Sequence, residues 1–192
     1  VKMHYFNSDG STAELCVNGI RCVSKYSIDN NLVNSTNIKV LAPIGEINTK
    51  VHENNISIEI ELPSYSKNKI IIDNHECIIS NIGNPHLLVE VSNVEKFNLI
   101  EFVNKVKKSE ILDGETNIEI YKLNSKKFIT ARVYERGVGE TDACGSGAIC
   151  MFYYLFDTNK AVNNSIVLYP GGELEMSIED NMIELKGEVT YL

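Results

Sequence analysis

The sequence lacks several features that mark common functional classes. Its 192 residues carry a net charge of −8, and the one basic cluster, Lys105-Val-Lys107-Lys108, is typical of a solvated helix face. This balance argues against a general binder of nucleic acid or of anionic membranes. The longest apolar run, at 148–156, is too short to cross a bilayer, and nothing at the start resembles a signal peptide. We therefore expect a cytoplasmic protein.

Metal-ligand spacing is also absent from the sequence. The five cysteines include no Cys-x-x-Cys pair, and the four histidines are scattered. Structural zinc sites usually take their ligands in closely spaced pairs. We predict no metal site and cysteines that stay reduced. Cys22, Cys77 and Cys150 fit buried structural thiols, because Cys22 and Cys150 fall inside expected helices.

What the sequence does contain is a motif that occurs twice. Cys16-Val-Asn-Gly-Ile-Arg-Cys22 and Cys144-Gly-Ser-Gly-Ala-Ile-Cys150 both have glycine three positions after the first cysteine and a second cysteine three further on. Asn7 and Glu135 each lie nine residues before the first cysteine, and a turn-rich segment follows in both copies. The repeat predicts two similar half-structures, each with a cysteine at the start of a helix.

A cysteine at a helix start suits acid–base chemistry. The thiolate is the reactive form, and a helix N-terminus lowers a thiol pKa from about 8.5 toward neutrality. The same turn leaves backbone N–H groups free to bind a carboxylate or phosphate. One such unit would suggest a nucleophile. Two facing units suggest a base on one side of a carbon and an acid on the other.

Composition and periodicity predict an α+β fold. Hydrophobic residues make up 43% of the chain and charged residues 23%, which is ordinary for a globular protein. We expect helices at about 16–30, 94–108 and 144–156. We expect strands at 1–7, 37–41, 46–51, 56–62, 69–73, 76–80, 87–91, 117–123, 127–134, 166–169, 173–178, 182–185 and 188–191. They would form two pseudo-symmetric halves, each a curved, mostly antiparallel sheet or barrel around a central helix.

Five ordered motifs give the sequence a family resemblance. They are Phe6-Asn7-Ser-Asp-Gly-Ser11, the first cysteine motif, Gly83-Asn84-Pro85-His86, Thr116-Asn117, and the segment from Glu135 to Gly147. In this order they resemble the diaminopimelate epimerases. The resemblance runs from the start of the chain to Gly171-Gly172 and the final strands. It implies a first half-domain at 1–62 without the family's opening segment, a second at 63–187, and a final strand at 188–192 that can return to the first half.

The resemblance implies a homodimeric isomerase that needs no cofactor. Members convert LL-diaminopimelate to the meso form, for lysine and peptidoglycan synthesis. Cys16 and Cys144 match the catalytic pair. The positions that match substrate-binding residues are Asn7, Val17, Asn18, Asn84, Asn117, Glu135, Arg136, Gly145 and Ser146, and His86, Gly19 and Gly147 match supporting positions. Arg136 suits a bidentate grip on a distal carboxylate.

The sequence departs from the family in a few places and leaves alternatives open. Val17 stands where the family has glycine, the family's His and Phe-Pro are missing around 110–116, and tryptophan is absent. One alternative is a related racemase acting on another amino acid, such as proline or hydroxyproline. Asn18 opposes it, because proline-type enzymes have histidine there. Another is a non-catalytic homologue, which the retention of both cysteines opposes.

Overall fold

The computed structural model describes residues 1–6, 10, 12, 15–109, 111–112 and 116–191. Its helices are α1 (Val17–Asp29), α2 (Leu99–Lys108) and α3 (Gly145–Asp157). Its strands are β1 (Asn37–Ala42), β2 (Gly45–His52), β3 (Asn55–Glu61), β4 (Ser64–Tyr65), β5 (Ile70–Ile72), β6 (His75–Asn81), β7 (Pro85–Glu90), β8 (Asn117–Leu123), β9 (Phe128–Glu135), β10 (Gly139–Thr141), β11 (Ser165–Tyr169), β12 (Gly172–Glu179) and β13 (Met182–Glu188).

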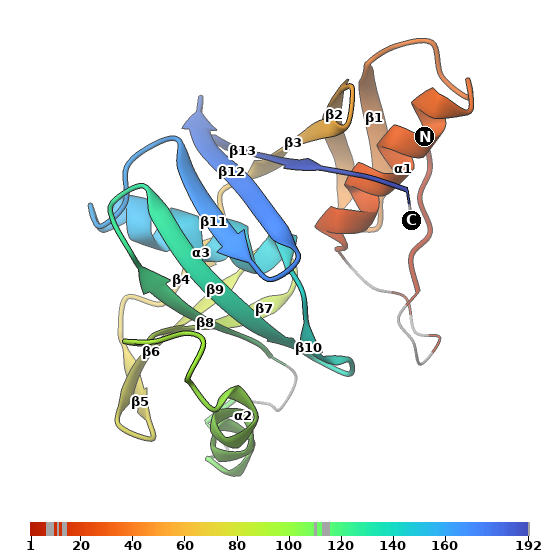
Figure 1. Ribbon diagram of the computed structural model, residues 1–192. Coiled ribbons are helices and arrows are strands. Elements are labelled where there is room, and N and C mark those ends of the chain that lie inside the picture. The colour runs from red at the N-terminus through yellow and green to blue at the C-terminus, as the bar shows by residue number, and fades with distance from the viewer. Residues whose placement is uncertain (7–9, 11, 13–14, 110, 113–115, 192) are drawn as a thin grey trace.

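The described strands belong to one curved sheet. Its order is β1-β2-β3-β13-β12-β11-β9-β8-β7-β6-β4, with β10 paired to β9 and β5 to β6. Neighbours are antiparallel except for the β9–β11 and β7–β8 pairs. β1, β2 and β3 cover α1, while β7, β8, β11, β12 and β13 wrap around α3 (Figure 1). The predicted α+β fold, with a curved, mostly antiparallel sheet around a helix, is confirmed. The division at 62/63 stays a prediction.

The two cysteine-led helices differ in how they are buried. α3 is apolar on nearly all sides, and Ile149, Met151 and Phe152 have no exposed surface. A helix of this kind belongs in a core. α1 is amphipathic: Ile20 and Ser24 face the sheet, while Cys22 faces solvent. The prediction of a buried Cys22 was wrong because residue 22 lies on the outer face of α1. None of the helices in the described ranges is long and apolar enough to cross a membrane.

Several element boundaries differ from the predicted ones. Residues 1–6 form no strand, because only Lys2 makes a bridge to β1, at Leu41. α2 begins at Leu99 and not at 94, because the Asn98 side chain accepts a hydrogen bond from the Glu101 N–H and caps the helix there. The strand predicted at 182–185 is longer than expected: β13 continues through Gly187 to Glu188 and pairs with β3. The separate strand predicted at 188–191 was wrong, because residues 189–191 form no strand. The turn-rich segment predicted between Glu135 and Cys144 contains a short strand, β10.

Candidate active site

Cys16 and Cys144 occupy the same structural position in the two halves. Each is the N-cap of its helix and has an extended backbone, with φ −130° and ψ 91° at Cys16 and φ −128° and ψ 112° at Cys144. Each sulfur accepts a hydrogen bond from the N–H three residues on, 3.3 Å from Gly19 and 3.5 Å from Gly147. The sequence repeat is therefore a repeat of one capping geometry.

The two helix N-termini meet at a pocket of about 100 Å³. Its lining includes ten of the predicted site residues: Cys16, Val17, Asn18, Asn84, Asn117, Glu135, Arg136, Cys144, Gly145 and Ser146. The pocket is also lined by residues that were not predicted as site residues, namely Tyr5, Leu15, Pro85 and Val138, of which Pro85 belongs to a family motif. Asn7 lies outside the described residues. The three predicted supporting residues do not line the pocket themselves, but each contacts a residue that does. Gly19 and Gly147 donate their N–H groups to the sulfurs of Cys16 and Cys144, and His86 contacts Asn84.

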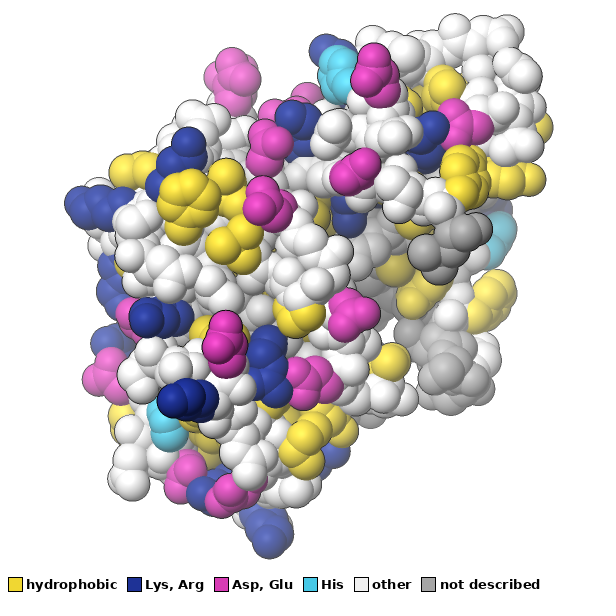
Figure 2. Space-filling view, in the orientation of Figure 1, with side chains coloured by type: hydrophobic (Ala, Val, Ile, Leu, Met, Phe, Trp, Pro, Cys, Tyr) yellow, Lys and Arg dark blue, Asp and Glu magenta, His cyan; other side chains and the backbone are white. Residues whose placement is uncertain are grey.

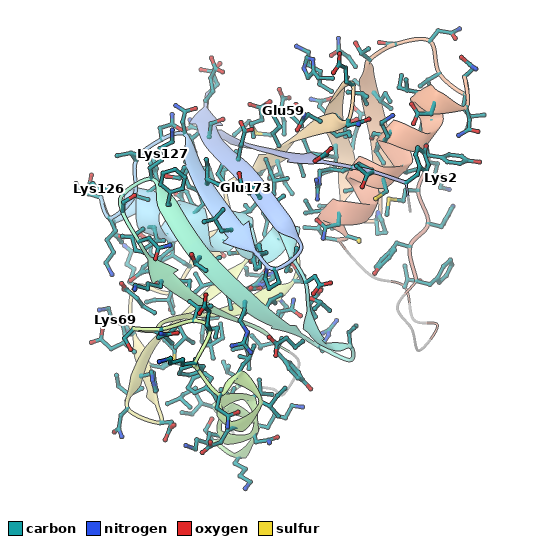
Figure 3. The ribbon with its side chains drawn as sticks, in the orientation of Figure 1. Lys2, Glu59, Lys69, Lys126, Lys127 and Glu173 are labelled. Carbon is teal, nitrogen blue, oxygen red and sulfur yellow. The ribbon has the colours of Figure 1, made fainter. Side chains whose placement is uncertain are left out.

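A larger hollow lies elsewhere on the molecule. It measures about 620 Å³ and is lined mostly by polar and charged side chains of β1, β2, β3, β12, β13 and the β12–β13 turn, together with Ile38 and Met182. Glu59 on β3 is one of them, well away from α3 (Figure 3). No cysteine or histidine is among its lining residues. The face in Figure 2 mixes acidic and basic side chains without a broad patch of either sign. We place the candidate site in the smaller pocket, because it holds both repeated cysteines.

Close packing joins the two cysteine turns. A Cβ built on Gly145 would lie 2.5 Å from Cγ1 of Val17, so only glycine fits opposite this valine. The Asn18 side chain donates to the Ala143 carbonyl across the two halves, at 3.2 Å, and accepts from the buried Arg21 guanidinium at 3.0 Å. The first-turn N–H groups of both helices are thus held around one pocket, where a carboxylate can accept them.

Burial dominates the electrostatics of both thiols. It raises the pKa of Cys16 above the ordinary value, with the Gly19 N–H and the Tyr5 hydroxyl acting in the opposite direction. Burial also raises the pKa of Cys144, well above the ordinary value, and the carboxylates of Glu119 and Glu135 raise it further. The expectation that the two thiol pKa values would lie below the ordinary value was therefore wrong, although the helix N–H groups do act in that direction. Desolvation of the thiolate outweighs the helix N–H groups.

Asn117, Glu135 and Arg136 meet where β8 and β9 end. The buried Asn117 side chain accepts a hydrogen bond from the Arg136 N–H at 2.9 Å, which fixes the backbone at the start of the turn. Glu135 accepts a hydrogen bond from the Thr141 hydroxyl across the β9–β10 hairpin. The exposed Arg136 side chain stands at the pocket edge, where it can reach a second charged group of a ligand.

Behind the pocket, His86 contacts Asn84, which was predicted as a site residue, and Glu119, which was not. Its Nδ1 lies 3.1 Å from Glu119 Oε1, and its Nε2 lies 3.2 Å from Asn84 Oδ1. The Tyr169 hydroxyl donates to Glu119 Oε2 at 3.2 Å. Glu119 and Tyr169 were missed. The available signal was an acidic residue in the middle of the buried strand Asn117–Leu123, where a carboxylate needs buried partners.

Three of these side chains also have metal-ligand spacing. The potential ligand atoms of His86, Glu119 and Cys144 lie within 4.8 Å of one another, and all three residues are buried. They come from three distant parts of the sequence, so no short motif could reveal them. The prediction that the protein has no metal site stays a prediction.

Solved structures with the same architecture are available for comparison. A hydroxyproline epimerase from Agrobacterium vitis matches with a TM-score of 0.76, at 10% identity, over 99% of this chain and 68% of that one. A PhzF-family phenazine biosynthesis protein from Bacillus anthracis matches with a TM-score of 0.72, at 17% identity, over 97% and 77%. These likenesses show the fold alone. Fold and site together define a protein of the diaminopimelate epimerase-like fold, with two helix-capping cysteines at one pocket.

Sequence comparison shows the family itself. The family model described as Diaminopimelate epimerase matches residues 1–66 and 78–192. A diaminopimelate epimerase of Prochlorococcus marinus (strain NATL1A) is 32% identical over 196 residues, covering 92% of this chain and 69% of the relative. One from Brachyspira hyodysenteriae is 30% identical over 215 residues, covering 100% and 76%. The chain belongs to the diaminopimelate epimerase family, and it is an isomerase of the amino-acid epimerase class.

Proposed function

We propose that this protein converts LL-diaminopimelate to meso-diaminopimelate, with Cys16 and Cys144 as the acid–base pair. The observation that carries the proposal is the placement of two N-capping cysteines, one from each half, around a single pocket. The relatives at 30% identity or more are named for this substrate, which supports the choice of amino acid.

The reaction needs two groups because it inverts one carbon. One cysteine, as thiolate, takes the α-proton, and the bond's electron pair stays on the α-carbon as a planar carbanion. The other cysteine, as thiol, gives its proton to the opposite face. Atoms and charge balance: one proton leaves the carbon, one arrives, and the two sulfurs exchange their protonation states. The reverse reaction uses the same groups in exchanged roles.

The pocket supplies what the carbanion requires. Val17, Asn18, Gly145 and Ser146 line the pocket at the first turns of the two helices. The free N–H groups of such turns can donate hydrogen bonds to the α-carboxylate from both helices. Fixed dipoles in a closed site stabilise charge that develops in the transition state. These backbone groups would therefore take the place that an electron-withdrawing cofactor has in other racemases, in line with the prediction that none is needed.

Arg136 and the asparagines would select the substrate. Diaminopimelate carries a second amino-acid group, whose carboxylate matches a guanidinium at the pocket edge. Asn84 and Asn117 lie on the same wall and can bind its polar atoms. Proline and hydroxyproline have no second carboxylate. The homodimer expected from the resemblance remains part of the proposal and can be tested by sedimentation.

The direct test is to incubate the reduced protein with LL-diaminopimelate and to separate the stereoisomers by chiral chromatography. We expect the LL form to give the meso form and the meso form to give the LL form, with the same equilibrium ratio reached from either side. Parallel incubations with L-proline and trans-4-hydroxy-L-proline serve as comparisons, and they should stay unchanged. Turnover of the imino acids without turnover of diaminopimelate would replace the proposed substrate.

A further inference from the structure

A buried polar row lies behind the Cys144 side of the pocket. Glu119 has no exposed surface and stands on β8 between Ile118 and Ile120, which are both buried. An isolated carboxyl in such a place is unfavourable unless hydrogen bonds satisfy it. Glu119 has such partners on two strands, His86 on β7 and Tyr169 on β11.

The row continues without a break to the sulfur. From Glu119 it passes to His86 at 3.1 Å and from His86 to Asn84 at 3.2 Å. Asn84 Nδ2 donates to the Ser146 hydroxyl at 3.3 Å, and that oxygen lies 3.4 Å from the Cys144 sulfur. Every link joins side chains of different elements or of one turn, so each side chain limits the rotamer of the next.

A glycine at position 147 makes this arrangement possible, because it has no side chain. A Cβ on Gly147 would lie 2.0 Å from Oε1 of Glu119. The first turn of α3 can therefore approach the carboxyl only because residue 147 is glycine. The same Gly147 donates its N–H to Cys144, so Glu119 and the thiol share one tight contact region.

These hydrogen bonds also fix the number of protons that the His86 ring and the Glu119 carboxyl share. His86 faces an oxygen acceptor at each ring nitrogen, Glu119 Oε1 at one and Asn84 Oδ1 at the other. Both contacts are satisfied by an imidazolium beside a carboxylate, or by a neutral ring beside a protonated carboxyl. In either form the His86–Glu119 pair holds two protons and no net charge. The pair can keep its hydrogen bonds while the charge on the neighbouring sulfur changes.

We propose that Glu119 and Tyr169 are positioning residues for Cys144. They hold His86, and through it Asn84 and Ser146, in the one orientation that places the Ser146 hydroxyl against the sulfur. The role in epimerisation rests on the proposed function; the effect on the thiol itself does not. The titratable groups around Cys144 are His86 on β7, Glu119 on β8, Glu135 on β9 and Tyr169 on β11.

The test compares Glu119→Gln and Tyr169→Phe with a matched control, Tyr121→Phe. Glutamine keeps the shape of Glu119 but removes its charge, and Tyr121 is a buried tyrosine of β8 that takes no part in the row. Two quantities are measured for each variant in the presence of a chelator: the kcat and KM of epimerisation, and the pH dependence of Cys144 alkylation by iodoacetamide. Peptide mass spectrometry separates Cys144 from the other thiols.

We expect Glu119→Gln to lower kcat about 10- to 100-fold, the range of one charge-assisted hydrogen bond, with KM nearly unchanged. Tyr169→Phe should lower kcat by about three- to tenfold, as for a neutral hydrogen bond. The alkylation midpoint of Cys144 should rise by about one pH unit in Glu119→Gln, because the Ser146 hydroxyl is no longer held against the sulfur and stabilises the thiolate less. Tyr121→Phe should leave both quantities at the wild-type values.

An alkylation midpoint that does not move in Glu119→Gln would overturn the proposal, even if kcat falls, because the loss would then reflect packing alone. A wild-type kcat in this variant would overturn it as well. If the wild-type protein turns over no diaminopimelate, the proposed function fails, while the alkylation comparison still decides whether Glu119 acts on Cys144.

Discussion

At the scale of single residues, the site depends on two sulfurs in unequal surroundings. Cys144 is buried beside two carboxyl groups, whereas Cys16 is partly exposed and lies near Tyr5. The resting thiol form is thus favoured more strongly at Cys144. Cys22 lies in the same motif as Cys16 but faces solvent, and it offers a control for general effects of losing a thiol.

Replacing either pocket cysteine should remove the activity. We expect Cys16→Ala and Cys144→Ala each to lower the epimerisation rate by at least about 10²- to 10⁴-fold, the contribution of a positioned acid or base. Cys22→Ala should retain the wild-type rate. The assay is isomer separation at saturating substrate, with thermal unfolding to verify folding. A pocket variant with wild-type turnover would rule out the two-cysteine mechanism.

The pH dependence should report the raised thiol pKa values. The reaction needs one thiolate, and burial raises the pKa of both thiols above the ordinary value. A base with a raised pKa is fully ionised only at higher pH, so kcat/KM should climb as the pH rises through the alkaline range. The measurement is a pH–rate profile of the free enzyme. A rate that is already constant from neutral pH upward would contradict the assigned environment.

At the scale of elements, the sequence repeat predicted both cysteine-led helices because each motif combines a cap, a glycine and an apolar run. It could not predict how the caps pack. Val17 stands where the family has glycine, yet it lies buried against Gly145 of the opposite helix. The start of α2 was predicted five residues too early, because the apolar residues before Asn98 continue the helical spacing although the cap begins the helix only at Leu99.

The Val17–Gly145 contact predicts a compensating pair of mutations. Gly145→Ala places a methyl group 2.5 Å from Val17 Cγ1, and we expect it to lower the free energy of unfolding by about 1–3 kcal/mol. Adding Val17→Gly to Gly145→Ala removes the clash. The double variant should therefore be more stable than the sum of the single effects predicts. Urea unfolding of all four proteins checks this, and strict additivity would show that the side chains do not touch.

Loss of the Asn98 cap of α2 should lower stability without affecting activity. Asn98→Ala removes the hydrogen bond to the Glu101 N–H, which measures 3.1 Å. We expect the free energy of unfolding to fall by about 1 kcal/mol. The epimerisation rate should stay at the wild-type value, since α2 packs on a separate core cluster away from both cysteines. A large loss of activity would mean that α2 has a role in the site.

At the scale of the whole molecule, the two halves share one sheet through the pairing of β3 with β13 (Figure 1). That pairing joins residues more than a hundred positions apart, and local patterns do not encode such register. The same is true of His86, Glu119 and Tyr169, which meet only when β7, β8 and β11 are in place. The motif residues of the pocket were predictable because family resemblance marks positions. Their buried partners follow from packing.

The central claim is that two different groups act on the two faces of the α-carbon. The most direct measurement is deuterium incorporation during the first few per cent of reaction in D2O, starting from LL-diaminopimelate and followed by NMR and mass spectrometry. Because the acid's proton comes from solvent, we predict that every meso molecule carries deuterium at the inverted carbon while the remaining LL substrate carries none. Undeuterated meso product would show that the abstracted proton is returned by the same group, and it would contradict the two-cysteine account.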